Sequence, residues 1–432
     1  MTERQAGRPL VAREVMASNA VAMGRRAGKA SQPSVVARVH EIALKGANRP
    51  WFMHTLVRNI EYALRGVPHE RPRVRNTRVV IPIAGVEVWP SVRERLAWVF
   101  GIANFSLALE TGLGLEELQD GLGRLLELLG PPSGGYRVRA KRTNKGYPMT
   151  SPELERVLGQ YVKDRTGAPV HLTAPEVTYQ IEILYDRALV SGTAVKGPGG
   201  LPVGVSGRVV VLLSGGFDSP VAAYRMLKRG CFLTLVHCHA YPYVRPVSIE
   251  KVVEIARHLG RYQPGVRLSI VPIGDAQREI ALVSEPGLRV LLYRRLMLRI
   301  AAAVAHEHGA GAIVTGESLG QVSSQTLENM RVIGAVTDLP LLRPLVGFNK
   351  DEIMAEAEQI GTAPVSRVPD DDCCTVFIPR HPATHATLAQ AEEAEQAFDA
   401  QALVDACLAQ RTDYEGDPAG WDVTLALAAA AR

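Results

Sequence analysis

Hydrophobic positions recur along this chain with two different patterns, and each pattern predicts a different kind of element. Near the N-terminus, Phe52, Leu56, Ile60 and Leu64 are spaced as on one face of a helix, which we expect to begin at Pro50. Residues 209–213 form a continuous apolar run instead, as in a strand that is buried on both faces of a parallel sheet. The chain therefore contains both helices and strands.

The order of these patterns predicts a mixed first part and a regular second part. Up to residue 195, short strands and helices alternate, with strands at 35–39, 79–83 and 136–141 and a helix at 115–129. Further on, strands at 209–213, 232–237, 266–272 and 312–315 are separated by helices near 219–229, 248–261 and 288–308. This alternation predicts a doubly wound parallel sheet. The breaker-rich run 195–202 is expected to be a linker.

Length and composition narrow the picture without identifying a function. A chain of 432 residues is long enough for two or three domains, and its net charge of +5 permits nucleic-acid binding without requiring it. Five unevenly placed cysteines favour the reducing cytoplasm over a disulfide framework. Residues 1–33 are rich in Arg and Ala and lack the apolar core of a secretory signal. We expect them to be a disordered basic arm, or Met16 or Met23 to be the true start.

The loop after the first buried strand carries the candidate chemistry. It reads Ser214-Gly215-Gly216-Phe217-Asp218-Ser219-Pro220. Anions bind at such strand-to-helix loops because the backbone N–H groups at a helix start are unpaired. The two glycines allow close approach to a phosphate, and the serine hydroxyls add donors. A carboxylate is out of place there unless it holds a metal ion, so Asp218 is a candidate Mg²⁺ ligand. The alternative is an ordinary turn in which Asp218 or Ser219 caps the helix.

Further segments make the chain similar to a known family. The loop resembles the pyrophosphate loop (PP-loop) of the adenine-nucleotide α-hydrolases, which cleave ATP between the α and β phosphates. Within that superfamily, residues 35–387 resemble the tRNA sulfurtransferases, or 4-thiouridine synthetases, a family also linked to thiamine thiazole synthesis. The matching segments are 41–46, 99–102, 199–204, 214–219, 315–327 and 372–375. Too few residues follow 387 for the rhodanese domain of some members, so we expect the short form.

The resemblance implies an α/β chain of several domains. These are an N-terminal ferredoxin-like domain at 34–89, a THUMP RNA-binding domain at 90–195 and a PP-loop ATP pyrophosphatase domain at 196–387. Residues 388–432 are expected to form a helical extension.

The resemblance also implies an ATP site with Asp218 as a catalytic residue. The implied ATP-binding residues are Leu212, Leu213, Ser214, Gly215, Gly216, Ser219, His237, Cys238, Arg294, Gly316 and Gln325. From the sequence alone, Arg294 beside Arg295 is more simply a solvated charge. The group Cys231, His237, Cys238 and His239 suggests zinc, but its spacing is not that of a zinc module. A buried strand that ends near ATP is the simpler interpretation.

Cys373 and Cys374 form a second candidate centre, on an expected loop after three aspartates, 370–372. The resemblance implies that one of them is catalytic and carries a transferable sulfur as a persulfide. The neighbouring carboxylates would raise the thiol pKa. The alternative is that both are used as small apolar residues. Which one attacks is left open, and Cys407 is a less suitable partner.

Basic residues alternate along and just beyond the strand at 136–141. They are Arg137, Arg139, Lys141, Arg142 and Lys145. Such residues can neutralise RNA phosphates or simply protect a solvated strand edge. The resemblance of this region to a THUMP domain favours RNA binding.

Together the resemblance implies an ATP- and Mg²⁺-dependent tRNA thiolase. O4 of uridine 8 would be adenylated and then replaced by the persulfide sulfur. The implied partners are tRNA, a cysteine desulfurase and a sulfur-carrier protein of the thiamine pathway, with a homodimer left open. The alternatives are a 2-thiouridine or 2-thiocytidine synthetase, an amide-forming ligase, and a non-catalytic RNA-binding sulfur carrier. A main role in thiazole sulfur transfer is a further alternative.

Overall fold

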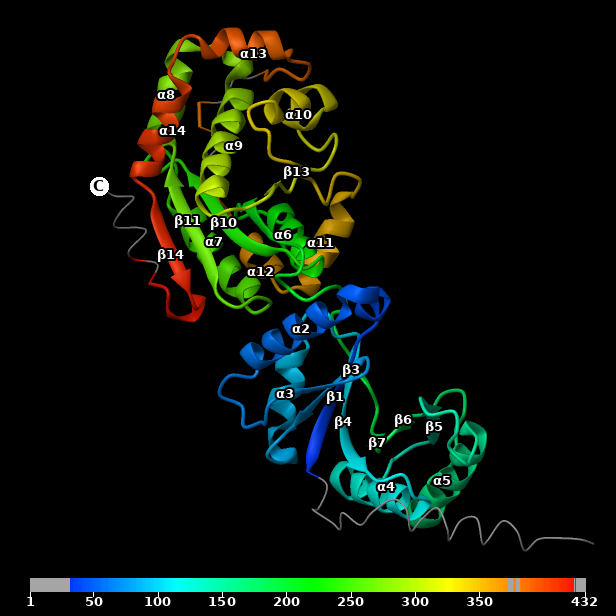
Figure 1. The fold of residues 1–432 in the computed structure, drawn as a ribbon. Coiled ribbons are helices and arrows are strands. Elements are labelled where there is room, and N and C mark those ends of the chain that lie inside the picture. The colour runs from blue at the N-terminus through cyan, green and yellow to red at the C-terminus, as the bar shows by residue number, and fades with distance from the viewer. Residues whose placement is uncertain (1–31, 371–375, 378–380, 423, 425–432) are drawn as a thin grey trace, which may run out of the picture. The chain divides into compact units, whose positions relative to one another are not determined.

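The computed structural model describes residues 32–370, 376–377, 381–422 and 424 (Figure 1). Their contacts divide the chain into two compact units. One unit consists mainly of residues 108–192, and the other joins residues 35–107 to the chain from 193 onward. The limits expected from the sequence, at 89/90 and 195/196, remain predictions, and the contacts divide the chain at 107/108 and 192/193 instead.

The N-terminal part of the larger unit is a small sheet with two helices. Its strands follow the order β2-β3-β1-β4. The elements are β1 (Pro33–Arg38), α2 (Arg49–Ala63), β2 (Arg73–Arg75), β3 (Arg78–Pro82), α3 (Trp89–Leu96) and β4 (Asn104–Thr111), with 3₁₀ turns η1 (Glu41–Leu44), η2 (Gly46–Asn48) and η3 (Val86–Val88). All four apolar positions predicted for the first helix are buried in one core. The helical spacing was therefore interpreted correctly.

The unit around residues 108–192 packs two helices onto a second group of strands. The last residues of β4 pair antiparallel with β7, β7 pairs antiparallel with β6, and β6 pairs parallel with the edge strand β5. The elements are α4 (Leu115–Leu129), β5 (Tyr136–Arg142), α5 (Ser151–Thr166), β6 (Val177–Ile183) and β7 (Ala188–Ser191). Helix α5 begins with a capping box in which Thr150 and Glu153 exchange hydrogen bonds. The predicted helix at 115–129 is confirmed.

The breaker-rich connection at 195–202 is more ordered than a linker. Its first residues form β8 (Val195–Lys196), which pairs antiparallel with β4. Gly199 then exchanges backbone hydrogen bonds with Gly101 and Ile102. Glycine and proline content predicted the irregular backbone. The segment to which it is hydrogen-bonded, residues 101–105, is distant in the sequence and could not be predicted from local composition.

The remainder of the larger unit is the expected doubly wound sheet. Its strand order is β13-β12-β9-β10-β11-β14, with every pair parallel except β11 with β14. The strands are β9 (Arg208–Leu212), β10 (Phe232–His239), β11 (Val266–Pro272), β12 (Ile313–Val314), β13 (Leu341–Leu342) and β14 (Thr412–Gly416). Separate apolar cores cover its two faces. The predicted fold class is confirmed.

Helices cover both faces of this sheet. Those that contribute to one core are α6 (Asp218–Lys228), α7 (Val247–Gly260), α11 (Lys350–Gln359) and α12 (Ala363–Ser366). Those that contribute to the other are α8 (Gly274–Val283), α9 (Arg289–Glu307), α10 (Leu327–Gly334), α13 (Leu388–Glu395) and α14 (Ala400–Ala409). Short 3₁₀ turns are η4 (Pro286–Leu288), η5 (Ser323–Gln325) and η7 (Pro418–Gly420). Among the described residues, no helix is long and apolar enough to cross a bilayer.

The C-terminal segment is only partly the helical extension that we expected. After α13 and α14, strand β14 adds to the edge of the parallel sheet in antiparallel orientation. Tyr414 and Trp421 then pack into the core beside α7. Local composition favoured a helix, but the open edge of β11 supplies hydrogen-bonding partners that the segment alone does not reveal.

Candidate active site

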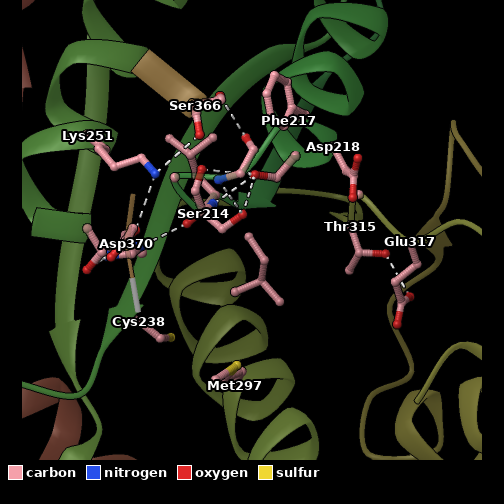
Figure 2. A pocket seen from close by; sticks show the side chains of 18 of the residues that line it. Ser214, Phe217, Asp218, Cys238, Lys251, Met297, Thr315, Glu317, Ser366 and Asp370 are labelled. Atoms are coloured by element: carbon pink, nitrogen blue, oxygen red, sulfur yellow. Dashed lines mark hydrogen bonds and ion pairs between the residues drawn. The ribbon is translucent and has the colours of Figure 1, made fainter. Parts of the chain in front are cut away.

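A cavity of about 720 Å³ lies where the parallel strands β9, β10 and β12 end (Figure 2). Such carboxyl edges are where open α/β sheets bind their ligands. The wall is formed by the loop after β9, the end of β10, helix α9, the segment after β12 and residues 366–370. Every residue predicted to bind ATP lines this one cavity, and so does Asp218. Their contacts with a nucleotide remain a prediction.

The phosphate loop is held closed by its two serines. The Ser219 hydroxyl accepts a hydrogen bond from the Ser214 backbone N–H at 2.8 Å and contacts the Ser214 hydroxyl at 3.0 Å. Helix α6 begins at Asp218, and its N-cap residue, Phe217, makes no side-chain capping bond. Asp218 and Ser219 thus lie in the first helical turn, so the alternative of an ordinary N-cap is wrong. The helix start faces the cavity, as anion binding requires.

Gly316 allows the segment after β12 to approach this first turn. A Cβ atom on Gly316 would lie 2.6 Å from the Ser219 backbone nitrogen and 2.8 Å from the Asp218 carbonyl carbon. Both neighbours are backbone atoms and cannot turn aside as a flexible side chain could. The close contact fixes the two walls of the cavity against each other.

Asp218 has partners that the sequence did not indicate. Its Oδ1 accepts a hydrogen bond from Lys350 Nζ at 2.6 Å, and its Oδ2 accepts one from Gln321 Nε2 at 3.2 Å. Lys350 is the first residue of α11, which lies 132 positions along the chain. Gln321 lies in the segment 315–327, which the sequence indicates as part of the site, but no local signal links Lys350 to the loop. The ion pair with Lys350 therefore explains why a carboxylate is present at position 218, even without a metal ion.

The donor set still fits a magnesium ion brought in by a nucleotide. Mg²⁺ is commonly held by one or two carboxylates together with substrate phosphates. Among the described residues, no group of three or more His, Cys, Asp or Glu side chains is arranged for a metal. Within the described part of the chain, Asp218 can thus serve as a protein carboxylate of such a site together with the phosphates of the nucleotide.

Arg294 lies in a buried charge network at the cavity wall. Its Nη1 lies 3.3 Å from Glu317 Oε1, and Arg343 Nε donates to the other oxygen of Glu317 at 2.7 Å. Thr315 Oγ1 also donates to Glu317, at 2.9 Å. The interpretation of Arg294 as a solvated charge is therefore wrong. Its neighbour Arg295 belongs to a different network, because adjacent helical residues point about 100° apart.

The end of β10 forms part of the cavity wall, and among the described residues its His and Cys side chains are not grouped as ligands of a metal. His237 Nδ1 lies 2.9 Å from the Leu213 carbonyl oxygen, and its Nε2 lies 3.2 Å from Ser248 Oγ. The His239 ring stacks on that of His237, and burial, with a smaller effect from His237, lowers the pKa of His239 to about 3. Cys231 is at the other end of the strand, where burial raises its thiol pKa.

The cysteine pair itself, Cys373 and Cys374, lies outside the described residues. The chain is described up to residue 370, and residues 366–370 line the cavity. Ser366 Oγ donates to the carbonyl oxygen of Gly216 at 3.1 Å, so this segment reaches the phosphate loop. Cys407 is buried, and burial raises its pKa to about 11, so it is a poor nucleophile at neutral pH.

The predicted RNA-binding residues divide between two faces of β5. Arg137, Arg139 and Lys141 alternate with the core residues Tyr136 and Val138, and the last two of the three basic residues are exposed. Lys145 is also exposed, in the loop that follows.

Arg142 is used differently from the other four basic residues. It donates to the backbone oxygens of Tyr147 and Met149, which stabilises that loop. The structure therefore places Arg137, Arg139 and Lys141 on one face of the edge strand β5 and Arg142 on the opposite face.

A parallel sheet whose first strand leads through Ser-Gly-Gly-x-Asp-Ser into a helix defines the class of PP-loop nucleotide-dependent enzymes. Three family models match successive parts of the chain: ThiI ferredoxin-like domain at 34–106, THUMP domain at 115–192, and thiamine biosynthesis protein (ThiI) at 204–400. The chain is 45% identical to a probable tRNA sulfurtransferase of Thermus thermophilus, over 86% of this chain and 91% of that protein. A counterpart in Moorella thermoacetica is 43% identical, over 87% and 95%.

A solved structure agrees with these sequence relatives. The crystal structure of a 4-thiouridine synthetase–RNA complex with bound ATP matches with a TM-score of 0.79 and 34% identity, over 89% of this chain and 100% of that chain. This chain belongs to the ThiI family of tRNA sulfurtransferases.

Proposed function

We propose that this chain is an ATP-dependent tRNA sulfurtransferase that converts uridine 8 of tRNA into 4-thiouridine. The observation that carries the proposal is a cavity in which the phosphate loop meets residues 366–370, which come shortly before the cysteine pair in the sequence. Family membership supports sulfur transfer to tRNA. The bound ATP and RNA of the 34% identical 4-thiouridine synthetase support these two substrates.

The first step is activation of the uracil carbonyl. O4 of the uridine attacks the α-phosphorus of ATP, and pyrophosphate leaves with the bonding electron pair. Loop amides and the N-terminus of α6 stabilise the charge on the departing pyrophosphate. Asp218 would hold Mg²⁺, which supplies further charge neutralisation at the phosphates when it is bound. Activation is needed because a carbonyl oxygen is a poor leaving group, whereas AMP is a good one.

The second step is replacement of AMP by sulfur. The terminal sulfur of a persulfide on Cys373 or Cys374 attacks C4, and AMP leaves. The second thiol of the pair then attacks the inner sulfur of the resulting disulfide, which releases 4-thiouridine and leaves an enzyme disulfide. A cellular dithiol must reduce that disulfide, and a cysteine desulfurase must supply the next persulfide sulfur. Cys407 is the less suitable resolving thiol, because it is buried and burial raises its pKa to about 11.

The other partners follow from the same assignment. Arg137, Arg139, Lys141 and Lys145 would contact tRNA phosphates. A sulfur-carrier protein of the thiamine pathway is a second acceptor for the same persulfide. We also propose a cytoplasmic location, where the thiols stay reduced, and leave a homodimer open.

The test is an Asp218→Ala variant assayed with tRNA, ATP and Mg²⁺. We expect both pyrophosphate release and 4-thiouridine formation to fall by about a hundredfold or more. Asp351→Ala is the matched control, because Asp351 is an exposed carboxylate beside Lys350 on α11. If Asp218→Ala still forms 4-thiouridine, read by its near-ultraviolet absorbance in tRNA, the loop does not have the proposed role.

Nucleoside analysis of the modified tRNA distinguishes the rival enzymes. A 2-thiouridine or 2-thiocytidine product, or an amide, would replace the present assignment with another PP-loop acceptor. Deleting residues 90–195 without loss of activity would favour these rivals as well. A non-catalytic sulfur carrier would give no pyrophosphate release under any of these conditions.

A further inference from the structure

We propose that Lys251 is a positioning residue that fastens the segment before the cysteine pair onto the phosphate loop, so that sulfur is delivered where uridine is adenylated. This inference rests on the proposed function, because it assumes that Cys373 or Cys374 carries the sulfur. Lys251 has no part in the phosphate loop motif and lies on α7, more than a hundred residues before the cysteines.

All described hydrogen-bonding and ionic contacts of the Lys251 ammonium group go to one short segment. Its Nζ donates to the Val368 carbonyl oxygen at 2.7 Å and to the Ser366 carbonyl oxygen at 3.4 Å. It also lies 3.5 Å from Asp370 Oδ2 (Figure 2). An ammonium group has three donors, and these three acceptors match that number. Lys251 lines the cavity, but its ammonium group is engaged by this segment.

The same lysine is packed against the loop. A Cβ atom on Gly215 would lie 2.9 Å from Lys251 Cε and 3.1 Å from Asp370 Oδ2. Gly215 therefore leaves just enough space for the lysine stem and the aspartate carboxylate to lie against the loop backbone. Together with the bond from Ser366 Oγ to the Gly216 carbonyl, the contacts join the loop, Lys251 and residues 366–370 into one packed unit.

The contacts between Lys251 and residues 366–370 are called the clamp below. Burial makes the clamp sensitive to loss of either charge, that of Lys251 or that of Asp370. The side chain of Lys251 is 6% exposed and that of Asp370 is 13% exposed. A buried charge that loses its counterion is driven toward water. Without the ammonium group, the Asp370 carboxylate should therefore move away from the loop toward water. Asp370 is only three positions before Cys373 in the sequence.

The chain on the other side of the cysteine pair is also held. Arg289, at the start of α9, donates to the carbonyl oxygen of Phe377 at 3.3 Å. The Phe377 ring packs edge-on against Tyr243, with ring centroids 5.5 Å apart. The described residues on both sides of the pair are thus attached to helices or loops of the same domain, by Lys251 on the N-terminal side and by Arg289 on the C-terminal side.

The decisive experiment separates adenylation from sulfur transfer. In the full-length enzyme with tRNA, ATP, Mg²⁺ and a persulfide donor, pyrophosphate release and 4-thiouridine formation are measured in single turnovers. For Lys251→Met we expect sulfur transfer to fall by about tenfold or more while pyrophosphate release stays within about threefold of wild type. Lys228→Met is the control, because Lys228 is an exposed lysine on the neighbouring helix α6, and it should change neither step.

Two other outcomes overturn the inference. If both steps fall in parallel, Lys251 acts on the nucleotide or on the fold as a whole, and if neither falls, the clamp has no role. A wild-type enzyme that releases no pyrophosphate would instead refute the proposed function, which is a different result.

A second variant guards against loss of folding in Lys251→Met. Asp370→Asn keeps the side-chain shape and removes the charge, so it should reproduce the selective loss of sulfur transfer. The double variant should be no slower in sulfur transfer than the slower single variant, because both changes break one contact. Fully additive losses, or an Asp370→Asn enzyme with wild-type sulfur transfer, would refute the clamp.

Discussion

Asp218 shows at the scale of one residue what a sequence motif conveys and what it omits. Its position in Ser-Gly-Gly-x-Asp-Ser predicted a place in a phosphate-binding site, and the structure places it in the wall of the cavity with the other predicted residues. A carboxylate at this position does not require a metal ion, because the Lys350 ammonium group lies 2.6 Å away. That lysine comes from a helix 132 residues later, and one sequence contains no signal that pairs the two.

Gly316 carries a prediction at the same scale. Replacing it with alanine should destabilise the domain by about 1 to 3 kcal/mol and raise the KM for ATP, because the new methyl group meets backbone atoms of the first turn of α6. Thermal unfolding and ATP titration measure the two effects. Gly311→Ala is the control, since a Cβ atom there meets nothing within 4 Å. Equal stability and KM in both variants would contradict the close contact.

At the scale of elements, the sequence predicted the central strands of the parallel sheet and the helices between them, but not the edge strands β13 and β14. Strand 266–272 matches β11, and the helix predicted at 219–229 after the phosphate loop corresponds to α6 (Asp218–Lys228). Long apolar runs and amphipathic periods are local properties, so the sequence reveals them. Strand β14 was missed because its polar sequence becomes a strand only where β11 offers a free edge.

The second prediction concerns the contact between α13 and α9. Glu395 on α13 accepts hydrogen bonds from Arg295 and Arg299 on α9. Although burial opposes it, these hydrogen bonds and charges lower the pKa of Glu395 from 4.5 to about 2. Glu395→Gln should cost about 3 kcal/mol at pH 7, because it leaves two partly buried guanidinium groups without their carboxylate.

The pH dependence of that cost follows from the lowered pKa. A carboxylate with a depressed folded-state pKa contributes stability above its unfolded value, here 4.5, and loses it as the pH falls toward about 2. The difference between wild type and Glu395→Gln should therefore be full at pH 7 and shrink below pH 4.5. Urea unfolding at pH 7 and pH 3 measures it, with the exposed Glu392→Gln on the same helix as control. A constant difference would contradict the buried ion pair.

At the scale of the whole molecule, the candidate active site and the candidate RNA-binding face lie in different compact units. The nucleotide cavity lies in the larger unit, and the basic face of β5 lies in the unit around residues 108–192. If that face binds tRNA phosphates, its loss should weaken binding without altering chemistry once tRNA is saturating.

Arg139→Gln and Lys141→Gln test this division. Each should raise the Kd for tRNA and reduce the slope of log K against log salt by about 0.7 to 0.9, as expected for one lost phosphate contact. Filter binding across a salt series measures both quantities. Lys163→Gln, an exposed change on α5, should alter neither. If the salt slope is unchanged in the β5 variants, those residues only protect the strand edge.

The sequence by itself determined the fold class, the order of the main elements and the phosphate loop, because these depend on local periodicity and on a contiguous motif. The tertiary structure decided which distant residues complete the site. Lys350 reaches Asp218, Glu317 joins Arg294 to Arg343, and Lys251 reaches residues 366–370 only after the sheet has formed. Those pairings depend on how strand ends and helices meet in space, and spacing along one chain does not specify that geometry.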